Sequence, residues 1–171
     1  MPDKGYLMTP GPTPIPPEVE AAMAQPIVYH RSAEFQEILG RVLSRLQEVF
    51  RTERDVILFT GSGSAAMESA VVNLCSPGDR VLVVSAGHFG ERWLQIAERF
   101  GCDVVPLRYA WGATPSPREV GAKLAEIGGA KAVYCTHCET STGVVADVRA
   151  IAEECRAAGA LCVVDAISSL A

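Results

Sequence analysis

Glycine and serine alternate in the run Gly61-Ser62-Gly63-Ser64, immediately before a predicted helix. Glycines let a ligand approach the backbone closely, and the free N–H groups and dipole of a helix start favour a phosphate. A tight strand-to-helix turn with a serine N-cap would explain the same residues without a ligand. The spacing matches neither Gly-x-Gly-x-x-Gly nor a Gly-Lys-Ser/Thr loop, which disfavours dinucleotides and nucleoside triphosphates. The run is therefore a candidate site for a small phosphate group.

An aromatic residue, Phe89, follows Gly87 and His88 and precedes Gly90 in a second predicted connection from a strand to a helix. A ring flanked by glycines is poorly placed for a hydrophobic core but can stack on a flat ligand. His88 could act as a general base, although a single histidine at a helix start is more often a cap or a surface residue. We expect Phe89 to stack on a ligand, and the role of His88 stays open.

Donors and acceptors are dense in residues 136–143, Thr-His-Cys-Glu-Thr-Ser-Thr-Gly, which follow another predicted strand. Cys135, His137 and Cys138 superficially resemble a metal site. No second Cys or His pair stands at zinc-finger or zinc-ribbon spacing, and consecutive strand residues point to opposite faces, so we expect no metal here. The run is better suited to binding the hydroxyl and carboxylate groups of a ligand.

Asp165 directly follows four apolar residues, 161–164, that predict a buried strand. A carboxylate in such surroundings is unfavourable unless it is paired, and a protonated ring nitrogen would be a suitable partner. The alternative is an ordinary strand-end aspartate that caps the next loop. Together, a phosphate cradle, a stacking ring and a strand-end carboxylate suit a phosphorylated aromatic cofactor.

The elements that would position these residues alternate along the chain from residue 55 onward. Apolar runs predict strands at about 56–60, 81–85, 103–107, 131–135 and 161–165, and the segments between them predict helices at about 64–74, 89–100, 116–127 and 147–158. Gly101, Gly128 and Gly159 fall where three of these helices should end. The alternation predicts an α/β fold of three layers, α/β/α, with a mainly parallel sheet. Ligands of such sheets bind at the carboxyl ends of the strands.

The N-terminal segment differs in composition, because residues 9–17 hold five of the eleven prolines. Proline cannot join a helix interior or a central strand, so we expect an arm over residues 1–17 and one domain over 18–171. A short helix should run from Pro17 to about Ala24, and an amphipathic helix should run from Ser32, its N-cap, to about Phe50.

Composition excludes several classes of function. The 171 residues carry a formal net charge of −5, and the 15 Lys and Arg residues are scattered, so we expect no nucleic-acid partner. No apolar run approaches the roughly 18 residues of a membrane helix and the start lacks a signal-peptide pattern, so we expect no membrane partner and a cytoplasmic location. The cysteines fall mostly in apolar patterns, and we expect them to be reduced and mostly buried.

The order of these segments resembles the class V aminotransferases, which are fold-type I enzymes that use pyridoxal 5′-phosphate (PLP), and especially their alanine/serine–glyoxylate branch. The resemblance covers essentially the whole chain. It rests on the motifs PGPTPIPPEV, GSGSAAME, GHFGERW, HCETSTGV and VVDAISSL, in family order and spacing. It implies that the chain is the N-terminal part of the PLP-binding large domain.

The resemblance assigns roles by position. Ser62, Gly63 and Ser64 match the residues that bind the phosphate of PLP, and Phe89 matches the aromatic residue that stacks on its pyridine ring. Asp165 matches the aspartate that pairs with the pyridine nitrogen and keeps it protonated, so that the ring can act as an electron sink.

Three further positions follow from the same resemblance. Thr140 matches the hydroxyl residue near the ring oxygen of the cofactor and the substrate, and Ile167 falls where the family packs an aliphatic residue under the opposite ring face. Gly11 falls in the arm segment that lines the substrate site. Many relatives have Trp where this chain has Phe89 and His where it has Ser64, which leaves the subgroup open but keeps an aromatic face and a backbone donor.

The family's Schiff-base lysine lies one strand beyond the position of Asp165, so we expect it beyond Ala171, together with the small C-terminal domain and its substrate-binding arginine. Lys4, Lys123 and Lys131 are the lysines of this chain, and all precede Asp165. We therefore expect no catalytic residue within the chain and an inactive portion in isolation.

The resemblance implies transamination between a small amino acid, alanine or serine, and a 2-oxo acid such as glyoxylate, in a protein that is a homodimer when complete. One alternative is a different PLP enzyme of the same fold, such as a cysteine desulfurase or a lyase. Another is a non-catalytic domain that binds a small phosphorylated ligand reversibly.

Overall fold

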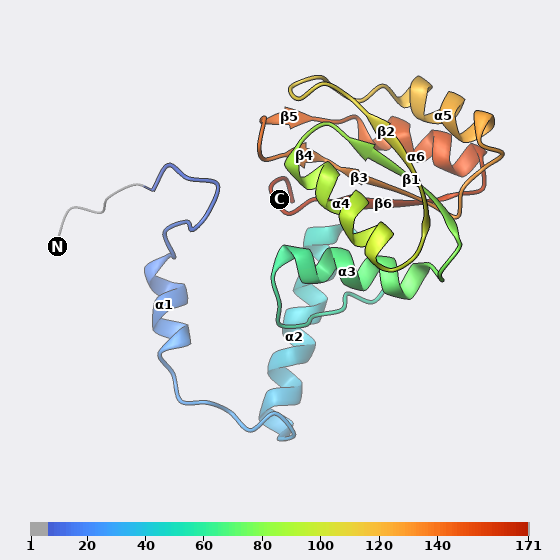
Figure 1. Cartoon of the computed structure of the whole chain (residues 1–171). Helices are drawn as coiled ribbons and strands as arrows, with labels where there is room; N and C mark the ends of the chain where they lie inside the picture. The colour runs from blue at the N-terminus through green and yellow to red at the C-terminus, as the bar shows by residue number, and fades with distance from the viewer. Residues whose placement is uncertain (1–6, 171) are drawn as a thin grey trace. The chain divides into compact units, whose positions relative to one another are not determined.

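The computed structural model describes residues 7–170, and the chain divides into two compact units, with the boundary after Leu58. The first unit contains helix α1 (Pro17–Met23) and helix α2 (Ala33–Phe50), shown in blue and cyan in Figure 1. The side chain of Ser32 accepts a hydrogen bond from the backbone N–H of Phe35 at 3.1 Å, which confirms the predicted N-cap. Neither helix buries a residue.

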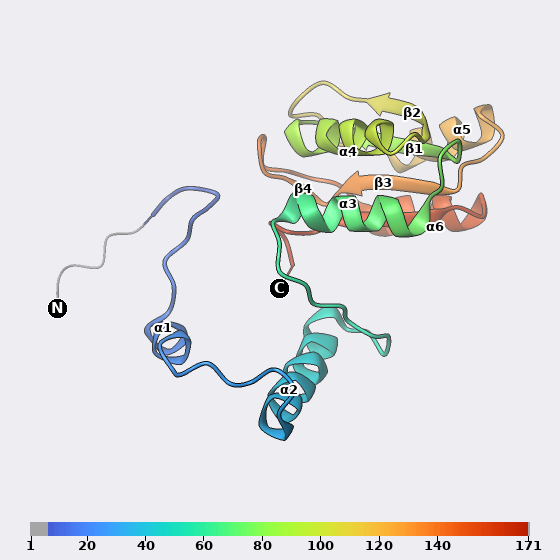
Figure 2. The same ribbon diagram turned by 60° about the horizontal axis from the view of Figure 1, so that its bottom comes forward.

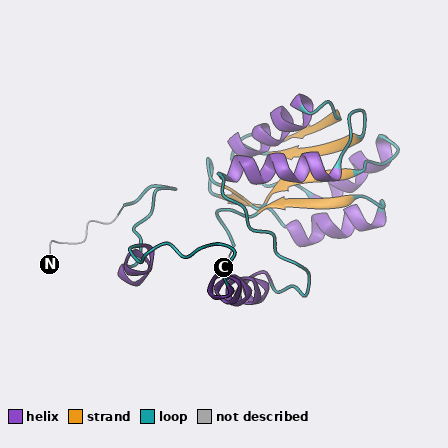
Figure 3. Cartoon of the chain, turned by 90° about the horizontal axis from the view of Figure 1, so that it is seen from below, coloured by secondary structure: helices purple, strands orange, loops and turns teal. Residues whose placement is uncertain are grey.

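The second unit is built on a parallel sheet with the strand order β2-β1-β3-β6. Its strands are β1 (Arg80–Ser85), β2 (Asp103–Arg108), β3 (Ala132–Thr136) and β6 (Leu161–Asp165). Strand β1 is central, and five of its six residues are buried, because helices cover both faces of the sheet. The predicted α/β fold with a mainly parallel sheet is confirmed, as Figure 3 shows.

Four helices cover the sheet, two on each face. They are α3 (Gly63–Leu74), α4 (His88–Arg99), α5 (Pro117–Glu126) and α6 (Val148–Ala157), labelled in Figure 2. Helices α3 and α4 pack on one face of the sheet and α5 and α6 on the other, since each pair shares a hydrophobic cluster with alternate residues of β1 and β3. Gly101, Gly128 and Gly159 end three of these helices with φ values of 78°, 74° and 70°, as predicted.

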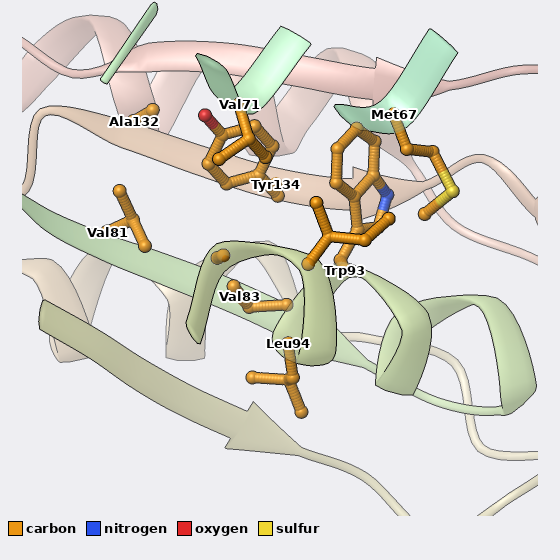
Figure 4. Packing of buried hydrophobic residues seen from close by; sticks show 10 residues of the cluster. Met67, Val71, Val81, Val83, Trp93, Leu94, Ala132 and Tyr134 are labelled. Atoms are coloured by element: carbon orange, nitrogen blue, oxygen red, sulfur yellow. The ribbon is translucent and has the colours of Figure 1, made fainter. Parts of the chain in front are cut away.

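The core on the α3–α4 face is centred on Trp93 and Tyr134, whose ring centroids are 4.8 Å apart (Figure 4). Met67 and Val71 of α3 close this cluster from above the rings, and Val83 of β1 lies within it. Because Trp93 lies only one turn after Phe89, its burial fixes the rotation of α4 and hence the direction of the residues at the helix start.

The cysteines depart in part from expectation. All six are free thiols, as expected, but only Cys135 and Cys155 are buried. Cys75, Cys102, Cys138 and Cys162 are half-buried, because they lie at element ends or on the outermost strand rather than on a central one.

The predicted strand at 56–60 is wrong, because these residues form an irregular segment. A strand needs backbone hydrogen-bond partners, and no strand among residues 7–170 pairs with this segment. Ile57 is 84% exposed despite its apolar side chain. A short antiparallel pair, β4 (Cys138–Glu139) with β5 (Val144–Val145), was not predicted, since two-residue strands leave no periodic pattern.

No helix among residues 7–170 is long and apolar enough to cross a membrane.

Candidate active site

Most of the predicted site residues lie in the second unit, beyond the carboxyl ends of the parallel strands or at the start of α3. Phe89 follows β1, Thr140 follows β3, and Asp165 and Ile167 lie at and after the end of β6. Thr136 pairs with Asp165 in the β3–β6 register, so the connections after these two strands begin side by side. This edge is where ligands of open parallel sheets bind.

The residues of the predicted phosphate cradle lie at the start of α3. Ser62 is the N-cap, and its hydroxyl accepts a hydrogen bond from the N–H of Ala65 at 3.4 Å. Gly63 and Ser64 occupy the first turn, where backbone N–H groups have no intrahelical acceptor. These two N–H groups, with the positive end of the helix dipole, can receive a phosphate.

Gly63 lies close to the chain that follows β6. A Cβ atom at Gly63 would lie 2.6 Å from Cδ1 of Ile167, inside contact distance. The aliphatic side chain predicted to lie under a cofactor ring therefore borders the predicted phosphate cradle. Ile167 is 65% exposed, which leaves its surface available to a ligand.

Phe89 is positioned by a buried carboxylate, Glu139, which is 3% exposed. Oε2 of Glu139 accepts hydrogen bonds from the N–H groups of Phe89 at 3.0 Å and Gly90 at 3.1 Å, at the start of α4. Oε1 accepts from the hydroxyl of Ser141 at 2.7 Å and from its N–H at 3.2 Å. Burial alone would raise the pKa of Glu139, but the hydrogen bonds from Ser141, Gly90 and Phe89 outweigh it and lower the pKa below 4.5.

Glu139 belongs to the polar run 136–143, which the sequence predicts to suit the hydroxyl and carboxylate groups of a ligand. Its carboxylate serves the start of α4 instead, as a charged N-terminal cap. Gly87 is part of the same arrangement, because a Cβ atom there would lie 2.5 Å from Cγ of Glu139. Nothing in the local sequence distinguishes this glutamate from its polar neighbours.

A second carboxylate, Glu91, ties the first turn of α4 to the sheet. Its Oε1 accepts a hydrogen bond from Ser85 Oγ at 2.6 Å and from Arg108 Nε at 3.0 Å. The hydrogen bond from Arg108 lowers the pKa of Glu91, and that from Ser85 acts in the same direction against the effect of burial. The helix that carries Phe89 is therefore fixed at its first turn to the ends of β1 and β2.

One carboxylate oxygen of Asp165 accepts a hydrogen bond within the chain. Its Oδ1 accepts a hydrogen bond from the N–H of Ile167 at 3.0 Å, which is the loop-capping contact foreseen as the alternative role. Among residues 7–170, Oδ2 accepts no hydrogen bond. Nearby, the Thr140 hydroxyl lies 2.5 Å from Ser168 Oγ, which joins the polar loop after β3 to the loop after β6.

Gly11 lies in the first unit, whereas the other predicted site residues lie in the second. Arg92 of α4 was not predicted, yet its Nη1 donates to Ser64 Oγ at 2.9 Å. Arg92 lies three residues, about one helical turn, after Phe89. That spacing alone could have suggested that both residues lie at the same edge of the sheet.

The chain matches the family described as aminotransferase class-V over residues 5–171. A relative named soluble hydrogenase 42 kDa subunit, from Anabaena cylindrica, is 43% identical over 99% of this chain and 45% of its own length. A relative named serine–glyoxylate aminotransferase, from Methylorubrum extorquens, is 37% identical over 99% of this chain and 43% of its own length. The solved structure of alanine–glyoxylate aminotransferase from Nostoc sp. gives a TM-score of 0.91 at 36% identity, over 95% of this chain and 43% of that one.

The chain belongs to the class V aminotransferase family, and it spans less than half the length of these relatives. The family depends on PLP. The residues present fit that cofactor, because the edge of the sheet offers free N–H donors for a phosphate, an aromatic face and an unbonded carboxylate oxygen.

Proposed function

We propose that this chain forms part of the PLP-binding domain of an aminotransferase that moves an amino group from a small amino acid, alanine or serine, to glyoxylate. The observation that carries the proposal is the grouping of the α3 start, Phe89, Thr140 and Asp165 at one edge of a parallel sheet. Family membership supports the reaction type, and relatives named for serine and alanine share glyoxylate in their names.

Each site residue then has one task. The N–H groups of Gly63 and Ser64 and the hydroxyl groups of the serines hold the phosphate. Phe89 would stack on the ring and Ile167 would pack against it, so that both exclude water. Oδ2 of Asp165 would keep the pyridine nitrogen protonated, because an adjacent carboxylate stabilises the charged form of that nitrogen.

The remaining task is a proton transfer at the α-carbon of the amino acid, for which PLP supplies an electron sink. Thr140 offers a hydroxyl to the ring oxygen or the substrate. Lys123 pairs with Glu126 at 2.7 Å on α5, and Lys131 pairs with Asp79 at 2.5 Å at the amino end of β3, the edge opposite the site. We infer that the amine which moves this proton comes from a lysine outside residues 1–171.

Two features of the complete protein belong to the same proposal. We propose a cytoplasmic homodimer. The support for the homodimer is the exposure of apolar side chains on α2, including Val42, Val49 and Phe50. Such a surface is unfavourable in water unless another surface covers it.

Amino-donor assays of the natively expressed protein test the proposal. Alanine and serine, each with glyoxylate, should give glycine together with the matching 2-oxo acid, and added PLP should not alter the product. Release of sulfide or alanine from cysteine, without glycine formation, would replace transamination by desulfuration on the same fold. Binding of PLP that is fully reversible, without turnover of any donor, would indicate a non-catalytic binding domain.

A further inference from the structure

Arg92 is a cation without a counter-ion in the part of the chain that the structure describes. Its Nη1 donates to Ser64 Oγ at 2.9 Å, and its Nη2 lies 3.5 Å from Nε2 of His88. Its Nε is shielded from solvent and has no hydrogen-bond partner. No carboxylate among residues 7–170 lies within ion-pair distance of Arg92, although Arg80 and Arg108 each have one. Arg92 as a whole is half-buried, but a shielded N–H group usually has a partner, and an anion beside the guanidinium would supply both that partner and the missing counter-charge.

The dipole of helix α3 also favours an anion beside Arg92. Ser64 lies in the first turn of α3, where the helix dipole is positive. A guanidinium group beside that end is repelled unless a negative group lies between or near them. The two free N–H groups of Gly63 and Ser64 are on the same turn, so one anion can satisfy both the helix start and Arg92.

The hydrogen bond also decides what Ser64 can do. A hydroxyl group has one donor hydrogen and two acceptor lone pairs, whereas arginine can only donate. Because Arg92 occupies a lone pair of Ser64 Oγ, the hydroxyl hydrogen of Ser64 is free to point at an anion. An accepting partner in the place of Arg92 would take up that hydrogen.

We propose that Arg92 is a positioning residue for the phosphate of the cofactor: it orients the hydroxyl of Ser64 as a donor and supplies the positive charge that balances the phosphate. The assignment rests on the proposed function, since it concerns the same cradle. Helix α4 then contributes two residues, one turn apart, to the binding of one ligand. Phe89 contacts its ring, and Arg92 acts on its phosphate directly or through Ser64.

The test compares PLP with pyridoxal, which has the same ring but no phosphate, in binding to the cofactor-free natively expressed protein. The variants are Arg92→Met, Arg92→Lys and Ser64→Ala, with Arg99→Met at the exposed end of the same helix as the control. The Arg92→Met variant loses a charge-assisted hydrogen bond, so it should bind PLP about 10- to 100-fold more weakly than the unmutated protein. Pyridoxal binding should change less than about twofold, and Arg92→Lys should recover most of the loss because it keeps the charge.

The double variant Ser64→Ala, Arg92→Met separates the two parts of the proposal. If Arg92 acts partly through Ser64, the double variant should lose clearly less affinity than the product of the two single losses. Equal losses for PLP and pyridoxal would show a merely structural role and overturn the assignment. An unchanged affinity for PLP, with a raised KM for the amino acid, would assign Arg92 to the substrate carboxylate instead.

A measurement on the unmutated protein covers the case in which Arg92→Met does not fold. Phenylglyoxal modifies arginine, and peptide masses report the labelling of Arg92. PLP and inorganic phosphate should each protect Arg92, whereas pyridoxal should not; protection by pyridoxal alone would contradict the assignment. Failure of the unmutated protein to bind PLP at all would instead overturn the proposed function, and the assignment with it.

Discussion

Glu139 connects three parts of the site at the scale of single residues. Its carboxylate accepts hydrogen bonds from the start of α4 and from Ser141, and it is almost fully buried. Phe89 is the first residue after His88 in that helix, so the direction of its ring depends on this cap. The stacking surface is therefore held in place by a buried charge of the protein itself.

Replacement of Glu139 by Gln should lower the free energy of unfolding by about 2 kcal/mol, the usual loss for hydrogen bonds to a charged group. Gln has one accepting oxygen, so it cannot accept from the N–H groups of Phe89 and Gly90 and also from Ser141. Urea denaturation measures the change, and Glu153→Gln on the exposed surface of α6 is the control, with an expected effect below about 0.5 kcal/mol. Equal stability of the two variants would show that the cap is dispensable.

The difference in stability between the unmutated protein and Glu139→Gln should depend on pH. The pKa of Glu139 is lowered in the folded state from its ordinary value of 4.5, because the hydrogen bonds outweigh burial. Its contribution to stability is therefore complete above about pH 4.5 and is lost as the pH falls through the lowered pKa. The stability difference between the unmutated protein and Glu139→Gln should be constant above that pH and shrink below it, and a difference that grows on acidification would contradict the hydrogen-bond pattern.

Asp165 offers a substitution that separates chemistry from folding. Asp165→Asn keeps an oxygen that can accept from the N–H of Ile167, so the free energy of unfolding should change by less than about 0.5 kcal/mol. The amide cannot hold a proton on the ring nitrogen as a carboxylate does, so the transamination rate of the native protein should fall about 100-fold. Steady-state rates and thermal unfolding measure the two effects, and retained activity would remove Asp165 from the mechanism.

At the scale of elements, the contact between α4 and β1 controls the geometry of the site. A Cβ atom at Gly90 would lie 2.6 Å from Cα of Ser85, which is backbone and cannot rotate away. Glycine at this position therefore lets α4 approach the end of β1 closely enough for Glu91 to reach Ser85.

Gly90→Ala should push α4 off the sheet and lower the free energy of unfolding by about 2 to 3 kcal/mol. Gly40→Ala in α2 is the matched control, because a Cβ atom there meets nothing within 4 Å and alanine is the better helix former. Chemical denaturation compares the two. A tolerated Gly90→Ala, with stability equal to that of Gly40→Ala, would contradict the close packing.

The sequence predicted those elements well whose pattern reports burial. The runs at 81–85 and 131–135 are apolar because both faces of the sheet are covered, and they form β1 and β3. The apolar run at 56–60 looked the same but lacks a pairing strand among residues 7–170, and pairing is not visible in local composition. The positions of Phe89, Thr140 and Asp165 at or after strand ends follow from that local pattern, whereas Arg92 and the cap formed by Glu139 depend on tertiary contacts.

At the scale of the whole molecule, apolar side chains remain uncovered. Leu58 and Phe59 are each about half exposed next to Ile57, and Leu161 and Val164 are exposed on β6, whose outer edge pairs with no strand among residues 7–170. Exposed strand edges and apolar patches promote association. These features support the proposal that other parts of a longer protein cover this surface.

The 171-residue chain expressed by itself should therefore associate or precipitate, or exchange segments between copies. Sedimentation velocity over a range of concentrations measures this association. Buffer without detergent should not reverse it. A monodisperse monomer that melts cooperatively at this length would show that the exposed surface is tolerated and would weaken the inference of further covering segments.

Borohydride reduction of the natively expressed protein, followed by its intact mass, tests the central claim most directly. The proposal of a PLP-dependent aminotransferase with a lysine outside residues 1–171 predicts a chain much heavier than 18.2 kDa that carries a covalent pyridoxyl adduct. An unmodified chain of 18.2 kDa would contradict it. In that case the cradle around Ser62 and Asp165 binds a ligand without covalent chemistry, or binds none.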